Sequence, residues 1–94
     1  MIIIRELIWT QSNIDHITRH NVTREEVEEV CHGSYIVLDA HGNRFLVIGP
    51  TQSGRALAII LDPEQEQSIY YPVTARQADR KERKKYFEMK GVRL

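Results

Sequence analysis

Residues 44–61 read RFLVIGPTQSGRALAIIL, two apolar runs on either side of a turn-forming segment. Residues 44–49 and 55–61 each have the length and composition of a strand, and the Pro, Ser and Gly between them are typical of a turn. The second run is apolar throughout from residue 56 to residue 61, which is the pattern of a central strand covered on both faces. We therefore predict an antiparallel strand pair at the centre of a sheet.

The segments outside this pair extend it to a meander. Residues 35–39 and 68–73 have the same strand-like composition, and turn-rich segments separate them from the central pair. Pro72 lacks an N–H donor, so we expect it at the end or the edge of its strand. Residues 2–9 are expected to form an opening strand or extended arm. The predicted antiparallel sheet thus has four to five strands.

Three helices are predicted around this sheet. Thr10 and Ser12 are N-cap candidates for the first helix. Thr23 and Glu26 have the spacing of a capping box, which opens the second helix. The segment TARQ, residues 74–77, has the same spacing and is expected to open a last helix that ends before the final glycine. The predicted fold is one α+β domain with the element order β-α-α-β-β-β-β-α.

Length and charge narrow the choice of function. A chain of 94 residues is long enough for one domain and too short for two. Its apolar runs are far shorter than the roughly 20 residues that cross a bilayer, and a single cysteine forms no internal disulfide, so we expect a cytoplasmic protein. Residues 23–70 hold three basic and eight acidic side chains, whereas residues 71–94 hold eight basic and three acidic. The excess of positive charge at this end of the chain predicts a polyanion or an acidic protein as partner. The alternative is that the charges lie on a solvated helix face and bind no partner.

Three motifs follow one another along most of the chain. They are Trp9 with RHNVT at 19–23 and the Glu-rich segment after it, RFLVIG at 44–49 with GR at 54–55, and TARQA at 74–78 with KER at 81–83 and Tyr86. In this order they resemble three features of BrnT-type toxins. The first stretch resembles the tryptophan, the K/R-H-G-V motif and the acidic helix of that family, and the second resembles its R-x-x-x-I-G and G-R strand pair. The third resembles its ending, S-A-R-x-A followed by E-R and Y. Asn21 replaces the usual Gly and Thr74 the usual Ser, and both substitutes suit the same backbone roles.

The resemblance implies a RelE-like toxin of a toxin–antitoxin module that cleaves RNA as an endoribonuclease, without a metal or other cofactor. It also implies neutralisation by a small cognate antitoxin and assembly into a homodimer or a toxin–antitoxin multimer. The alternative is a non-catalytic interaction module, either a degenerate toxin or an antitoxin-bound co-repressor. A housekeeping nucleic-acid binder without a protein partner is a third hypothesis.

Metal-free RNA cleavage needs a base, an acid and cationic donors for the charge that builds on the phosphate. Arginine suits the phosphate because its planar fork donates two parallel hydrogen bonds. Arg44 and Arg55 begin adjacent predicted strands and Arg76 follows the fourth strand, so we predict that the three converge at one sheet end. A surface or ion-pairing role for each is the structural alternative.

His20 is the predicted acid or base, since its unperturbed pKa of about 6.5 allows proton exchange near neutrality. It could instead simply close the first helix. Glu82 lies at helical spacing between apolar residues, so it serves in proton transfer or in a structural ion pair. Arg80, Arg83 and Lys84 are the predicted nucleic-acid contacts, because cations at helical spacing form a stripe along which a backbone can lie.

A zinc site and a reactive thiol are weaker alternatives. His16 and His20 share a helical face and could begin a zinc site with Cys31 or His32. Cys31 shares the apolar face of the second predicted helix, and no histidine stands at a spacing that would activate it. We therefore predict no metal site and a core role for Cys31.

Overall fold

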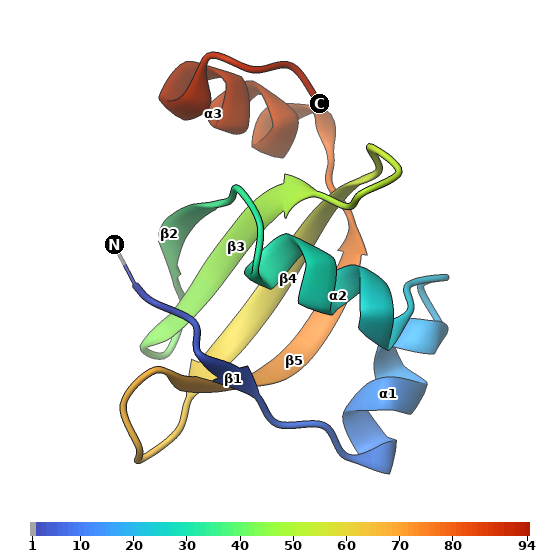
Figure 1. Ribbon diagram of the computed structural model, residues 1–94, viewed down its shortest axis with the longest axis vertical. Helices are drawn as coiled ribbons and strands as arrows, with labels where there is room; N and C mark the ends of the chain where they lie inside the picture. Colours follow the sequence, from blue (N-terminus) through green and yellow to red (C-terminus); the bar gives the residue numbers. More distant parts are fainter. Residues whose placement is uncertain (1) are drawn as a thin grey trace.

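The computed structural model describes residues 2–94, which form a five-stranded sheet and three helices (Figure 1). The predicted α+β class and element order are confirmed. None of the helices within these residues is long and apolar enough to cross a membrane. Along the chain the elements are β1 (Glu6–Leu7), α1 (Gln11–Thr18), α2 (Arg24–Cys31), β2 (Ile36–Ala40), β3 (Arg44–Pro50), β4 (Ala56–Pro63), β5 (Ile69–Gln77) and α3 (Arg80–Lys90).

The sheet is mixed, with strand order β1-β5-β4-β3-β2. Strands β2 to β5 form the predicted antiparallel meander. β1 instead runs parallel to β5, with Glu6 opposite Ile69 and Leu7 opposite Tyr70, so the prediction of a purely antiparallel sheet is wrong at this edge. Two helices and three strands, β2 to β4, separate β1 from β5 in sequence. The direction of β1 therefore depends on how β1 packs beside β5 and not on a local turn.

The first two helices begin where their capping signals predict. Thr10 Oγ1 accepts a hydrogen bond from the Asn13 N–H at 3.3 Å, and Asn13 Oδ1 accepts from the Thr10 N–H at 2.9 Å. Thr23 and Glu26 form the same reciprocal pair at 3.1 and 3.0 Å. These bonds lie within four residues of sequence, so they form without any tertiary partner.

The last helix begins later than predicted, because β5 continues to Gln77. Thr74 and Gln77, which we expected to open the helix, lie in the ladder between β4 and β5. The capping box consists instead of Asp79 and Glu82, so α3 starts at Arg80. The buried strand β4 needs hydrogen-bond partners along its whole length, and that requirement outweighs a local capping signal.

Pro72 lies inside β5 and not at its end, but β1 pairs only with Ile69 and Tyr70, so Pro72 lies on an open edge of the sheet, the second of its two predicted positions. Leu61 lies opposite Pro72 while Ile60 lies opposite Thr74, so Val73 is an extra residue and forms a bulge. A bulge is one of the few places in a sheet where a residue without an N–H donor fits.

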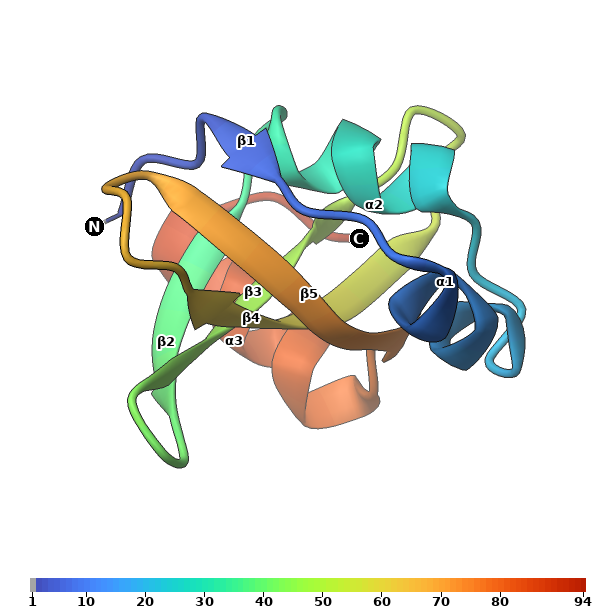
Figure 2. The same cartoon turned by 90° about the horizontal axis from the view of Figure 1, so that it is seen from below.

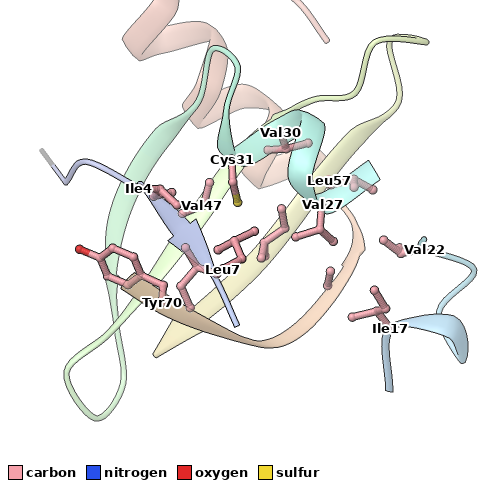
Figure 3. Packing of buried hydrophobic residues seen from close by; sticks show 13 residues of the cluster. Ile4, Leu7, Ile17, Val22, Val27, Val30, Cys31, Val47, Leu57 and Tyr70 are labelled. Carbon is pink, nitrogen blue, oxygen red and sulfur yellow. The ribbon is translucent and has the colours of Figure 1, made fainter. Parts of the chain in front are cut away.

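The two faces of the sheet carry separate cores. On β4, Leu57 and Ile59 belong to the core beneath α1 and α2, whereas Ala56 and Ala58 belong to the core beneath α3, where Tyr86 is buried. Figure 2 shows α2 on one side of the sheet and α3 on the other. The α1 and α2 side chains of the larger core, seen in Figure 3, are Ile17, Val27, Val30 and Cys31.

Candidate nucleic-acid interface

Helix α3 has one buried residue, which packs against the sheet. Tyr86 is almost fully buried, and its hydroxyl donates to the Ser34 carbonyl at 2.9 Å. At the other end of the helix Gly91 adopts φ 72°, and its N–H donates to the Phe87 carbonyl at 2.7 Å. Because Tyr86 alone of the helix is buried, the remaining faces of α3 are available to solvent and to partners.

Those faces carry a concentration of positive charge. Seven cations lie on α3 and in the four residues after it, and none of them forms an ion pair with a carboxylate of residues 2–94. A cation without a local partner keeps its full attraction for an external anion. The seven are Arg80, Lys81, Arg83, Lys84, Lys85, Lys90 and Arg93.

Four of these cations surround a hollow of about 260 Å³, which we name the α3 hollow. The Arg93 guanidinium carbon lies 4.6 Å from the centre of the Phe87 ring, within cation–π distance. Arg83 Nη1 donates to the Ala78 carbonyl at 3.1 Å, which anchors its side chain beside the hollow. The lining residues are Arg80, Arg83, Lys84, Phe87, Arg93 and Leu94. The three predicted nucleic-acid contacts thus line a single hollow.

Arg76 and Glu82 form an ion pair at the start of α3. Arg76 Nη1 and Nη2 donate to the two Glu82 carboxylate oxygens at 2.7 and 2.8 Å. The Glu82 hydrogen bond raises the pKa of Arg76 and outweighs the opposing effect of burial. The Arg76 side chain is 46% exposed and that of Glu82 is 12% exposed. The arginine therefore remains reachable from solvent, whereas the carboxylate is mostly enclosed.

The predicted convergence of three arginines does not occur. Arg55 Nη1 donates to the Asn21 carbonyl at 2.6 Å and to Glu26 Oε1 at 3.1 Å, on the face covered by α1 and α2. Arg44 Nε lies 3.9 Å from Asp62 Oδ1, at the far end of β4. Adjacent antiparallel strands begin at opposite ends, so a strand length of roughly 20 Å separates the two arginines.

Arg76 is also separated from both. It lies opposite Ala58 and shares the α3 face, so the sheet stands between Arg76 and Arg55. Arg44 lies two strands away from Arg76 and nearer the other sheet end. The prediction of one shared phosphate site is therefore wrong, and each arginine has a carboxylate partner instead.

His20 lies apart from Arg76 and Glu82. It follows α1, its backbone N–H donates to the Ile17 carbonyl at 3.0 Å, and its exposed ring lies 5.7 Å from that of His16. Within residues 2–94, no group of three or more side chains is arranged to hold a metal ion.

Cys31 is buried in the larger core, as predicted. Burial raises the pKa of its thiol to about 12, with a further contribution from the Glu28 charge. A thiol with so high a pKa is almost entirely protonated near neutrality and is a poor nucleophile.

The sequence predictions omitted Phe87 and Arg93. Phe87 adjoins Tyr86 on the helix, so one aromatic ring faces the sheet and the next lies outside it. Arg93 returns to this ring because Gly91 turns the chain back after α3. The sequence signal that could have identified Phe87 was an aromatic residue beside the apolar stripe of a basic helix.

Comparisons with protein-family models, with curated proteins and with solved structures found no match to this chain. Its function must therefore be inferred from its own side chains. Two arrangements of side chains bear on the function. One is the set of unpaired cations around the α3 hollow, and the other is the Arg76–Glu82 pair at the start of the same helix.

Proposed function

We propose that this protein is the RNA-cleaving toxin of a toxin–antitoxin module and that it holds RNA on the α3 surface, by which we mean the α3 hollow together with the seven unpaired cations of residues 80–93. The α3 hollow carries the proposal, because four cations without carboxylate partners surround it. Contact with such cations releases counterions from the phosphate backbone, which favours RNA binding. The BrnT-like motifs support a metal-independent endoribonuclease with a RelE-like fold, a cytoplasmic location and a small antitoxin as its partner.

Within this proposal, Glu82 is the general base and Arg76 the phosphate ligand. Glu82 Oε2 accepts one protein hydrogen bond, from Arg76, which leaves it a second lone pair. Although the carboxylate is mostly enclosed, the 12% of the Glu82 side chain that stays exposed is where this lone pair would take the proton of a 2′-hydroxyl. Arg76 has two N–H donors beyond those used on Glu82 and Gln77. These donors stabilise the phosphate charge that develops during the attack.

The reaction is an internal displacement at phosphorus. The 2′-oxygen forms a bond to phosphorus after Glu82 removes its proton, and the bond from phosphorus to the 5′-oxygen breaks. The leaving 5′-oxygen takes a proton from solvent. The products are a 2′,3′-cyclic phosphate and a 5′-hydroxyl end, which end-group analysis of the RNA fragments identifies.

The test is cleavage of RNA by the purified protein in the presence of a metal chelator, with and without ribosomes. Glu82→Gln keeps an oxygen that can cap the helix but removes the base, so cleavage should slow by about 10²-fold or more. Arg44→Gln is the matched control, because Arg44 lies at the other sheet end and its loss should leave the rate unchanged. If His20→Ala lost cleavage while Glu82→Gln retained it, the result would contradict the role of Glu82 and place the reaction on the α1 face of the sheet.

The second candidate function is a non-catalytic interaction module. It is favoured by one observation, that Arg44, Arg55 and Arg76 each already face a carboxylate. In this case the α3 surface binds RNA or an acidic antitoxin, and no RNA is cleaved under any of the conditions above.

A further inference from the structure

We propose that the α3 hollow binds one unpaired nucleotide of an RNA strand, with the base stacked on Phe87 and Arg93 and the phosphate on the flanking cations. This inference rests on the proposed function and specifies the form of RNA that the surface accepts. It assigns a role in base stacking to two residues, Phe87 and Arg93. It also predicts a preference for single strands over duplexes.

An exposed aromatic ring within a cationic hollow provides the stacking surface. Phe87 is 39% exposed although it is a large apolar residue, so part of its ring is open to solvent. The Arg93 guanidinium, 4.6 Å from the ring centre, adds a second planar group to the same stack. Bases stack on both aromatic rings and guanidinium planes. A base that joins this stack removes exposed apolar surface from water.

The cations around the ring are spaced for a phosphate beside the stacked base. Arg83, Lys84 and Phe87 lie three, four and seven residues after Arg80, which places all four on one side of the helix. Arg83 uses one N–H on the Ala78 carbonyl and retains four. The phosphate and the base of one nucleotide can therefore be bound from neighbouring turns.

The size of the hollow suits a single strand. Its volume of about 260 Å³ lies just below the roughly 300–1,000 Å³ of sites that enclose drug-sized ligands, so it has room for one base of a polymer. In a duplex, each base is already stacked between its neighbours and cannot present its face to Phe87. A duplex would reach the cations but not the ring.

The experiment measures binding of the full chain to three labelled RNAs of equal length by fluorescence anisotropy over a series of salt concentrations. The RNAs are a single strand, its duplex and an abasic strand, each with a non-cleavable 2′-substituent. We expect the single strand to bind about tenfold more tightly than either of the others, since stacking contributes a factor of about 5 to 150 per base.

Two variants assign the preference to the stack. Phe87→Leu keeps an apolar side chain but removes the ring, and Arg93→Lys keeps the charge but removes the plane. Each should lower affinity for the single strand by about tenfold without changing the salt dependence, because no phosphate contact is lost. Met89→Leu is the matched control, an exposed apolar residue of the same helix that does not line the α3 hollow. It should bind as the parent protein does.

Equal affinity for the single strand, the duplex and the abasic strand would overturn the nucleotide site and leave RNA binding by α3 intact. Full single-strand affinity in Phe87→Leu would overturn it as well. Absence of binding to all three RNAs would contradict both this inference and the proposed function.

Discussion

Arg76 and Glu82 are joined by two parallel hydrogen bonds of 2.7 and 2.8 Å, which tie the end of β5 to the first turn of α3. Glu82 Oε1 also accepts from the Asp79 N–H at 2.8 Å, so one carboxylate caps the helix and holds the strand. The placement of the cationic helix against the sheet therefore depends on this carboxylate and on the buried Tyr86.

Glu82→Ala should destabilise the protein more than Arg76→Ala. Loss of Glu82 removes both the ion pair and the capping bond to Asp79, an expected cost of about 1–2 kcal/mol in the free energy of unfolding. Arg76 is 46% exposed, so its loss should cost only about 0.5 kcal/mol. Urea unfolding measures both values, with Arg80→Ala as a control that removes a nearby unpaired cation. Equal costs for the two variants would contradict the double role of Glu82.

The Glu26–Arg55 pair should make stability depend on acid. Burial of Glu26 raises its pKa, but the Thr23 N–H and the Arg55 guanidinium outweigh burial and lower the pKa overall. A lowered pKa in the folded state contributes stability above the unfolded value of about 4.3, and the contribution disappears as pH falls through the folded value. Glu26→Gln should therefore be less stable near neutrality and lose less stability in acid.

Unfolding of the parent protein and of Glu26→Gln, followed from neutral to acidic pH, checks this prediction. Glu25→Gln is the matched control, because Glu25 is exposed on the same helix and has no ion-pair partner among residues 2–94. Parallel pH profiles for the parent protein and Glu26→Gln would show that the pair contributes nothing in this range.

Tyr86→Phe should loosen α3 from the sheet. The change leaves the Ser34 carbonyl without its 2.9 Å hydrogen bond, at an expected cost of about 1 kcal/mol. Tyr71→Phe is the comparison, since the Tyr71 hydroxyl lies 3.2 Å from Thr10 Oγ1 in a solvent-exposed position and should cost less. Hydrogen exchange of the α3 amides should accelerate in Tyr86→Phe and not in Tyr71→Phe. The opposite ranking would contradict the anchoring role.

Cys31 should react with alkylating reagents only when the chain unfolds. Its burial and its thiol pKa of about 12 leave almost no accessible thiolate in the folded protein. Mass spectrometry of iodoacetamide labelling near neutral pH should show a protected thiol in buffer and a modified thiol in urea. Rapid labelling of the folded protein would place Cys31 outside the core.

The outcomes for Thr23 and Thr74 show where prediction from sequence succeeds. Thr23 caps α2 as expected because its partners lie within four residues. Thr74 has the same kind of spacing, yet it is paired in the sheet opposite Ile60. A capping motif contributes about 1 kcal/mol, which a strand with a neighbouring ladder to complete can exceed.

The arginines show where prediction fails. Arg44 begins β3 and Arg55 directly precedes β4, but in an antiparallel pair the two beginnings lie at opposite ends. Arg55 and Arg76 lie nearer to each other along the sheet but on different faces, because side chains alternate along a strand. Composition and spacing do not contain the register that sets these positions.

By itself, the sequence determined the meander, the start of the first two helices and the basic end of the chain, since each depends on alternation, short-range spacing or composition. Only the tertiary structure decided the parallel direction of β1, the partner of each arginine and the meeting of Phe87 with Arg93. Those features depend on register, on strand direction and on contacts between distant segments. They form only when the two sheet faces are buried together with their helices.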